Sequence, residues 1–367
     1  MMTWIIAPWV AALAVFSVTV AEAQQVVTVD LEAGRTIIED EWRAMYPRTA
    51  VVDWASNVLY VQDDEEPEGI MAFSLTTGEW IRTIPTPTGD GPAELTEGLR
   101  SLAVARGGGV YASGLVRVIE FDALGQFVRS WTPEAPTRDA VCDFSGAPAV
   151  PTQGGVVRRG FDGDENIGPV LAKGSVIDAP TIEAGVAITM RLVSSRIACA
   201  EDEDVAYVVS SYDAGPDTVF VYRPGAEEGR ITLPTDFIEN PGCVRESRLG
   251  GQTLTRPCPM WSRNLRASFD DQGNLVLFGS DKTVQGTIID PETGCYAMVR
   301  TPSNRTQRIG HIYADSALVF RLDTGMQYVE GLGDVEVTYG NSATGVSMRP
   351  IRRVSGEPCP GMLPSVI

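Results

Sequence analysis

The amino-acid sequence predicts an all-β fold, a six-bladed β-propeller with four-stranded antiparallel blades around a central channel. The first observation is the stretch 88–131, where four short apolar runs are separated by Gly-rich or Asp-x-x-Gly turns, as in an antiparallel meander. The second is that similar units recur about every fifty residues, a period typical of propeller blades. The third is a content of 37 Gly and 24 Pro residues, which suits many turns.

A ring explains how such units are stabilised. A twisted four-stranded sheet cannot bury both of its faces alone, so blades packed face to face around an axis cover one another. The alternative is an irregular pair of β-sandwiches. The ring must also close, and either the N-terminal strand 26–31 or a disulfide-pinned C-terminus is expected to complete the last blade.

The N-terminal residues 1–23 are expected to be a secretory signal peptide. Residues 4–20 are apolar, and Ala-Glu-Ala at 21–23 is a small-x-small cleavage site. No Lys or Arg precedes the apolar run, so an uncleaved membrane anchor is the alternative, although the run is short for a full span. We therefore expect a single propeller domain over 24–367 that is exported, periplasmic or extracellular, with no membrane span in the mature chain.

The N-terminal strand and the first two blades follow clear patterns. The run 26–31 alternates apolar and polar residues, as a half-buried strand does. Strands of the first blade, 48–87, are expected at 51–52, 58–61, 70–75 and 80–84. Strands of the second blade, 98–131, are expected at 102–104, 110–111, 116–121 and 127–131.

The remaining blades are read from similar apolar runs, and the third is the least regular. Its best strands within 138–190 are 141–144, 155–157 and 186–188. The fourth blade, 196–234, has runs at 205–209, 218–222 and 229–233, and an insertion at 235–264 follows it. The fifth blade, 265–302, has runs at 274–278, 286–289 and 296–299; the sixth, 308–354, has runs at 317–320, 326–329, 335–339 and 351–354.

The six cysteines suggest disulfides, because an even count in an exported chain is typical of a disulfide framework. No Cys-x-x-Cys or Cys/His spacing indicates a zinc site. The expected pairs join residues that bracket one loop, residues at equivalent places in successive blades, and a last pair that would pin the C-terminal tail: Cys243 with Cys258, Cys142 with Cys199, and Cys295 with Cys359.

One short motif resembles a known family. Residues 89–95, Gly-Asp-Gly-Pro-Ala-Glu-Leu, resemble the Gly-x-Gly-Pro-Gly-Glu-Phe signature of secreted bacterial six-bladed β-propeller proteins, which are relatives of the NHL-repeat propellers. In those proteins the signature lies between blades, shortly before an innermost strand. Ala93 replaces the usual Gly, which argues against a left-handed backbone there, and Leu95 replaces the usual Phe. The resemblance implies fold and export, and it supplies no catalytic residues.

Composition restricts the chemistry. A net charge of −19 disfavours binding to nucleic acid or to an anionic membrane. His311 is the single histidine, which rules out multi-histidine metal sites and leaves it as the sole candidate for a Ser-His-Asp triad. No Gly-x-Ser-x-Gly elbow is present. His311 precedes an inner strand, so it either faces the channel or is a hydrogen-bonded structural residue.

Residues 162–166, Asp-Gly-Asp-Glu-Asn, resemble the start of a calcium loop. An EF-hand needs Gly at the sixth position and Glu at the twelfth, which are here Ile167 and Lys173. We interpret the segment as a solvated acidic turn and expect no cofactor, with calcium as the alternative. Two further acidic pairs are interpreted as turn residues: Asp202 with Asp204, and Asp270 with Asp271.

Arginine shows the one pattern that points to a ligand. The chain has 27 Arg and 2 Lys, and an Arg stands just before the first strand of every predicted blade: Arg48, Arg100, Arg138, Arg196, Arg266 and Arg308. First strands line the channel of a propeller, so these residues are expected to form a basic ring at its mouth, together with His311. Guanidinium groups suit carboxylate, sulfate or phosphate ligands. Alternatively, the Arg side chains pair with turn acids and fix blade-to-blade register.

The leading hypothesis is an exported, non-enzymatic binding or scaffold module for an anionic glycan, a peptide or a partner protein. The alternative is a calcium-dependent propeller hydrolase or lactonase, which would need a cluster of Asp, Glu and Asn at the channel floor. A third possibility is a purely structural interaction protein with a plugged channel and an exposed apolar patch.

Overall fold

The structure is a computed structural model, and it describes part of the chain. The described residues are 25–38, 47–63, 69–137, 140–152, 156–169, 195–200, 204–210, 218–226, 229–232, 239–249, 252–259, 266–270, 272–278, 286–300, 307–313, 316–329 and 333–356. All regular elements in these ranges are β-strands. No helix in them is long and apolar enough to cross a membrane. The predicted signal peptide lies outside these ranges.

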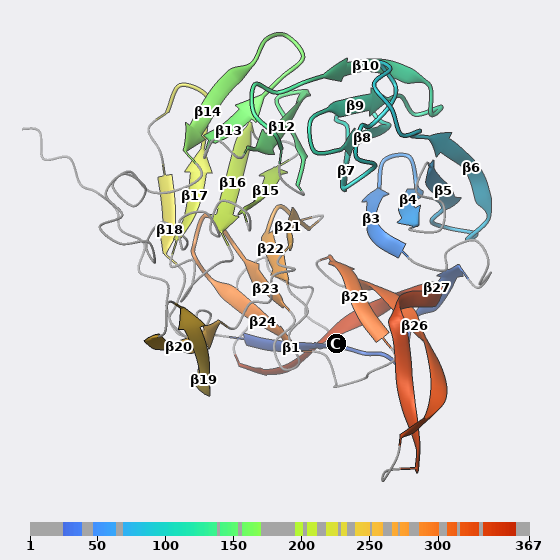
Figure 1. Ribbon diagram of the computed structural model, residues 1–367, viewed down its shortest axis with the longest axis vertical. Coiled ribbons are helices and arrows are strands. Elements are labelled where there is room, and N and C mark those ends of the chain that lie inside the picture. The colour runs from blue at the N-terminus through green and yellow to red at the C-terminus, as the bar shows by residue number, and fades with distance from the viewer. Residues whose placement is uncertain are drawn as a thin grey trace, which may run out of the picture.

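The ring begins with two separate four-stranded sheets in which consecutive strands pair antiparallel (Figure 1). The first contains β3 (Pro47–Asp53), β4 (Val58–Asp63), β5 (Gly69–Ser74) and β6 (Trp80–Pro85). The second contains β7 (Ser101–Val104), β8 (Val110–Ser113), β9 (Val118–Phe121) and β10 (Phe127–Trp131). Turn glycines permit the tight hairpins: Gly109, at φ +92°, lies so close to the Phe121 carbonyl oxygen that a Cβ would be 2.2 Å from it.

Two further four-stranded sheets repeat this order. The third contains β11 (Cys142–Phe144), β12 (Ala147–Pro151), β13 (Val156–Arg159) and β14 (Glu165–Pro169). The fourth contains β15 (Ser195–Ala200), β16 (Val205–Ser210), β17 (Thr218–Tyr222) and β18 (Gly229–Thr232). The third sheet spans Cys142–Pro169, a shorter stretch than the predicted blade 138–190. Its strands β12 and β14 were not predicted, and the predicted strand 186–188 lies outside the described residues.

The last part of the chain and the N-terminus share one nine-stranded sheet. Its members are β21 (Arg266–Phe269), β22 (Leu275–Phe278), β23 (Gly286–Ile289), β24 (Tyr296–Arg300), β25 (Gln307–Ile312), β26 (Ser316–Val329), β27 (Gly333–Gly356), β1 (Gln25–Val29) and β2 (Arg35–Ile38). The predicted separate strands 326–329 and 335–339 are wrong, because both continue the long β26–β27 hairpin. After β25, β26 and β27, the fourth strand in the order of this sheet is β1, which pairs antiparallel with β27.

The sheets form a ring in which the first strand of each is innermost (Figure 1). Contacts between first strands follow the chain from β3 to β7, β11, β15 and β21, and β25 contacts both β22 and β3, which closes the circle. The chain is thus a β-propeller. Because the last two units share one hydrogen-bonded sheet, the count of six blades stays a prediction.

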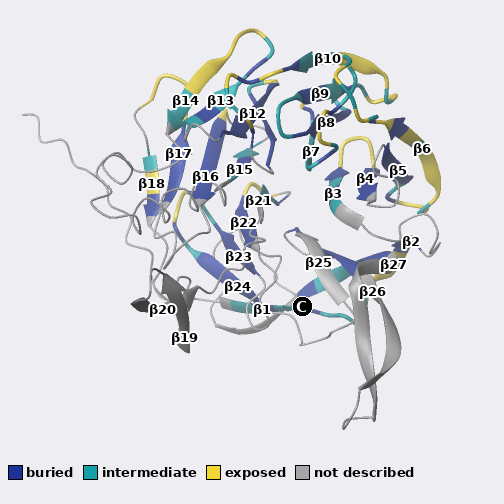
Figure 2. Cartoon of the chain, in the orientation of Figure 1, coloured by how far each residue is buried: buried dark blue, intermediate teal, exposed yellow. Residues whose placement is uncertain are grey.

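The core lies at the seams between neighbouring sheets rather than inside any one of them. One apolar cluster joins Val58 and Ile70 of the first sheet to Leu102 and Ile119 of the second. Similar clusters occupy the other seams of the described ring. Figure 2 shows where burial is greatest, in middle strands such as β8 and β16, whereas β6 and β10 at the rim carry exposed residues. Face-to-face packing of sheets is therefore what stabilises the fold.

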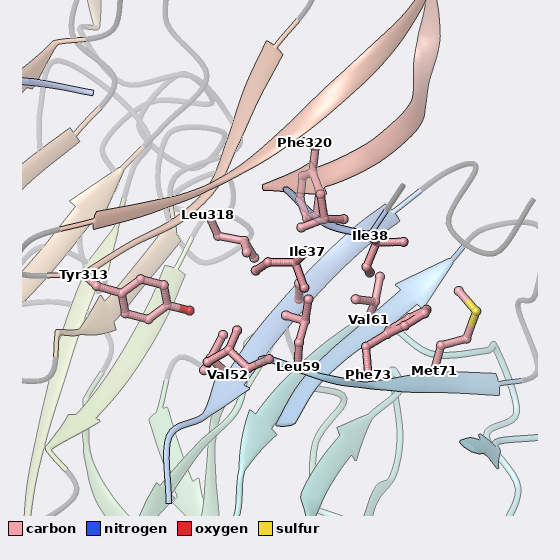
Figure 3. Close-up of a cluster of buried hydrophobic side chains, with 13 residues drawn as sticks. Ile37, Ile38, Val52, Leu59, Val61, Met71, Phe73, Tyr313, Leu318 and Phe320 are labelled. Carbon is pink, nitrogen blue, oxygen red and sulfur yellow. The ribbon is translucent and has the colours of Figure 1, made fainter. Parts of the chain in front are cut away.

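The N-terminal arm, 25–38, closes the ring by entering two seams. Its strand β1 lies between β24, to which it is parallel, and β27. Its strand β2 pairs with β27 and places Ile37 and Ile38 in a cluster with Leu59 and Phe73 of the first sheet (Figure 3). Of the two closures considered from the sequence, the structure shows the N-terminal strand.

The disulfides agree with the predicted pairing where they are described. Cys142 and Cys199 are bonded, with their Cα atoms 5.5 Å apart, and they join the first strands of two successive sheets. Cys295 is also disulfide-bonded, and its predicted partner Cys359 lies outside the described residues. In the insertion, β19 (Glu239–Leu249) and β20 (Gln252–Pro259) pair so that Val244 opposes Pro257. That register sets Cys243 and Cys258 near each other along the backbone, and their bond stays a prediction.

Candidate functional site

The arginine positions predicted from the sequence fall at the beginnings of innermost strands. We call the side of the ring where first strands begin the leading side, and the side where they end the trailing side. Because every sheet starts with its innermost strand and then steps outward, first strands begin on the same side. The positions are Arg48 in β3, Arg100 directly before β7, Arg196 in β15, Arg266 at the start of β21 and Arg308 in β25. Arg138 lies outside the described residues.

The side chains of this group are described for two members. Arg100 donates from Nη2 to Glu97 Oε2 at 3.3 Å, and its side chain is 31% exposed. Such a solvent-exposed ion pair contributes little stability and breaks readily. Arg196 is partly buried. The side chains of Arg48, Arg266, Arg308 and His311 lie outside the described residues, so convergence on one opening stays a prediction.

The loop that leads to Arg100 is folded around a glutamate. The Glu94 carboxylate accepts the Gly91 N–H at 2.7 Å, and a Cβ on Gly91 would lie 2.8 Å from Glu94 Cδ. Leu95 is fully buried and its N–H donates to the Pro87 carbonyl at 2.9 Å. Ala93 has no positive φ, as expected. The Gly, Glu and Leu positions of the signature thus shape a compact turn between the first two sheets.

Arg117 holds the same loop from the connection between β8 and β9. Its guanidinium donates to the carbonyl oxygens of Asp90 at 3.2 Å and Glu94 at 3.0 Å, and also to that of Gly91. Sequence reasoning treated Arg117 as an ordinary strand residue, because no pattern links it to a loop more than twenty positions away. The interactions show a positioning residue for the loop before Arg100.

The acidic segment 162–166 is exposed throughout, as expected of a solvated segment, but only its first part is a turn. Glu165 and Asn166 belong to β14, and Glu165 forms an ion pair with Arg159 at 3.1 Å. Asp164 accepts the Glu134 N–H at 2.6 Å and lies 3.7 Å from the Arg158 guanidinium. Across the described residues, no three His, Cys, Asp or Glu side chains are grouped so as to hold a metal ion.

The turn interpretation is confirmed for Asp270, whose Oδ1 accepts the N–H groups of Gln272 and Asn274 at 2.9 and 2.8 Å. Asp204 lies in the turn before β16 and also pairs with Arg106 at 3.0 Å. Hydrogen bonds from Ser145 and Arg106 lower the pKa of the Asp204 carboxyl. Asp202 and Asp271 lie outside the described residues.

A buried carboxylate ties the second sheet to the third on the trailing side. Asp143 Oδ2 accepts the Tyr111 hydroxyl at 3.0 Å and the Arg106 N–H at 2.8 Å. Its Oδ1 accepts the Gly146 N–H at 2.9 Å. Burial, and then the Asp143 charge, raise the pKa of Tyr111. With its oxygens so engaged, Asp143 acts as a structural hub between sheets.

Comparison with known proteins gives only distant similarities. No protein-family model matches this chain, and no curated protein matches it. Among solved structures, it is similar to U3-55K at 8% identity and a TM-score of 0.49, over 88% of this chain and 99% of that one. The values for the RRP9 WD40 repeats are 9%, 0.49, 88% and 99%. Those for a gluconolactonase from Xanthomonas campestris are 13%, 0.48, 86% and 89%. At these identities and TM-scores, the similarities assign the chain to no family.

Proposed function

We propose that the chain is an exported, non-enzymatic binding propeller that recognises an anionic ligand at the mouth of the ring on its leading side. The observation that carries the proposal is the recurrence of an arginine at the beginning of the innermost strand in sheet after sheet. Arg48 and Arg100 represent it in two sheets whose first strands touch. A circle of guanidinium groups would concentrate positive charge where the protein is otherwise strongly acidic.

Export is supported by the disulfide and by the loop before β7. The Cys142–Cys199 bond is typical of an oxidising compartment. The compact turn formed by residues 89–95 gives a structural reason for a motif that resembles the secreted NHL-like propellers. Both observations agree with the predicted leader at 1–23.

The ligand hypothesis is tested by titrating the purified protein with sulfated and carboxylated oligosaccharides, using calorimetry. We expect Arg48→Gln together with Arg100→Gln to weaken binding at least tenfold, because a carboxylate or sulfate loses two charged donors. Glu97→Gln should strengthen binding, since it removes a carboxylate that competes with the ligand for Arg100. The matched control is Arg223→Gln, an exposed arginine that directly follows β17.

The comparison at equal charge is between Arg100→Gln alone and Arg223→Gln. Equal losses in these two single variants would contradict the proposal, because the effect would then be one of net charge alone. A rise in thermal stability with calcium that EDTA reverses would contradict it in favour of the calcium-dependent hydrolase.

A further inference from the structure

An open pocket lies on the trailing side, at the seam between the first sheet and the β25–β27 strands. It has a volume of about 490 Å³ and is lined by residues that include Arg35, Trp54, Ser316, Met348 and Arg349. Its size is within the range of small-molecule sites, and its mixture of apolar wall and a few charged donors is typical of them. None of these residues was singled out from the sequence.

Trp54 supplies a fixed aromatic surface in this pocket. It lies in the turn after β3 and is 45% exposed. Burial of apolar area therefore does not explain why a large aromatic side chain stands at this turn. Its ring packs edge-to-face with Tyr313, with ring centroids 4.8 Å apart and planes at 83°. Tyr313 is itself buried in the core cluster of Figure 3. The indole is therefore held in place while almost half of its surface remains available to a ligand.

The two arginines are held by neutral groups. Arg349 donates from Nη1 to the Ala33 carbonyl at 2.8 Å and from Nε to Ser347 Oγ at 3.0 Å. Arg35 donates from Nη1 to the Thr76 carbonyl at 2.8 Å. Among the residues that the structure describes, neither guanidinium pairs with a carboxylate, and the Nη2 of each makes no hydrogen bond. Both positive charges thus remain available, in a chain with 48 acidic and 29 basic residues.

The pocket wall is pre-formed by the N-terminal arm. The Asp30 carboxylate accepts the N–H groups of Glu32 and Ala33, which bends the chain between β1 and β2. Gly34 follows at φ +100°, so close to β27 that a Cβ would lie 2.2 Å from the Met348 carbonyl oxygen. This turn fixes both Arg35 and the carbonyl that holds Arg349. A ligand would meet a site that needs little reorganisation.

We propose that this pocket binds a uronic acid, a sugar ring that carries a carboxylate, as one unit of an acidic glycan. The apolar face of the ring would stack on Trp54, and the carboxylate would accept hydrogen bonds from the free Nη2 groups of Arg35 and Arg349. The open mouth leaves room for the remainder of the glycan to extend into solvent. The site is on the opposite side of the ring from the predicted arginine circle, so this inference does not depend on the proposed function.

The decisive experiment compares two sugars on the unaltered protein. Galacturonic acid and galactose share a ring and differ at one carbon, which carries the carboxylate in the first and a neutral alcohol in the second. We expect galacturonic acid to quench tryptophan fluorescence and to bind at least tenfold more tightly than galactose. Equal binding of both sugars, or binding of neither, would overturn the proposal, and so would tighter binding of benzoate or of an acidic peptide.

Variants then locate the binding. Arg35→Gln and Trp54→Ala are each expected to weaken galacturonic acid binding at least tenfold, while Trp80→Ala, an equally exposed tryptophan on β6, should leave it unchanged. Circular dichroism and thermal unfolding verify that each variant folds. If Trp54→Ala is unfolded, Trp54→Leu serves in its place, because it keeps an apolar side chain and removes the aromatic face. A loss in Trp80→Ala, or in Arg100→Gln but not Arg35→Gln, would place the ligand elsewhere and refute the site.

Discussion

At the scale of single residues, the hydrogen bond between Tyr111 and Asp143 shows how buried polar groups join neighbouring sheets. Tyr111 is 1% exposed and Asp143 is 7% exposed. Tyr111 lies on β8, the second strand of its sheet, and Asp143 lies on β11, the first strand of the next sheet. The pKa of Tyr111 is raised mainly because burial disfavours the phenolate, and further because a carboxylate lies beside it. The neutral phenol is thus required for this seam.

This raised pKa predicts a specific response to alkaline pH. The pKa of Tyr111 in the native protein exceeds its value of about 10 in the unfolded chain. The contribution of the neutral Tyr111 side chain to stability is therefore complete below pH 10 and is lost as pH rises through the native pKa. At pH 11, Tyr111 should remain neutral in the native protein. Phenolate absorbance of Tyr111→Phe should therefore equal that of the wild type at pH 11 in the native state and fall below it after unfolding. A lower native signal in the variant would show that Tyr111 ionises.

Sequence reasoning identified residue types better than residue partners. The arginine series could be recognised in the sequence because it recurs once in each predicted blade. A single buried pair such as Tyr111 and Asp143 does not recur and could not be recognised. Asp143 was assigned to a strand, but its partner Tyr111 is 32 positions away in another sheet. Likewise, the pocket joins Arg35 to Arg349 across almost the whole chain, so that only closure of the ring brings them together.

At the scale of strands, the disulfide between β11 and β15 links two neighbouring first strands. Its cysteines are 57 residues apart in sequence, so the bond closes a long loop in the unfolded chain. Chain-entropy reasoning gives a stabilisation of about 4 kcal/mol for a loop of this size. Cys142 also lies in the apolar cluster that joins the third and fourth sheets.

We expect the double substitution Cys142→Ala with Cys199→Ala to lower the free energy of unfolding by about 2–5 kcal/mol. Replacing both residues avoids a free thiol that could exchange with the disulfide of Cys295. Urea unfolding followed by tryptophan fluorescence measures the change, and reduction of the wild type serves as a comparison. An unchanged midpoint would mean that seam packing alone determines the stability of this region.

Prediction of individual strands succeeded where apolar runs were regular and failed where prolines or long hairpins altered the pattern. The second sheet has strands close to those expected, because its runs are separated by glycine turns. In the third sheet, β12 contains Pro148 and Pro151, which read as breaks in a strand. The β26–β27 hairpin was divided in two, because glycines at 325, 340 and 345 interrupt its apolar runs; in the structure the pairing shifts register between Arg321 and Thr324 and then continues.

At the scale of the whole molecule, closure depends on the N-terminal arm. A propeller ring assembled only from consecutive hairpins would leave the outer edge of β27 unpaired. Strand β1 covers that edge and also the edge of β24, so one short segment joins two units. The sequence left two candidates for this role, since either terminus can supply a strand. The deciding contacts are non-local and become visible only in the folded ring.

The closure can be tested with two neighbouring substitutions on opposite faces of β1. Val27 is fully buried in the seam cluster with Val276 and Val319, so Val27→Asp buries an unpaired charge. It should cost more than about 4 kcal/mol or abolish cooperative unfolding. Thr28 is only partly buried, and its register partners are Arg300 and Arg352.

Thr28→Asp adds the same charge beside two basic positions and is expected to change the free energy of unfolding by less than about 1 kcal/mol. Urea titration of both full-length variants separates the two outcomes. Should Val27→Asp keep the wild-type midpoint, β1 would not be the strand that closes the ring. Should Thr28→Asp be as damaging as Val27→Asp, the charge rather than the buried face would explain the loss. A large effect confined to Val27 is the expected result, because Val27 is the residue that β1 places in the seam cluster with Val276 and Val319.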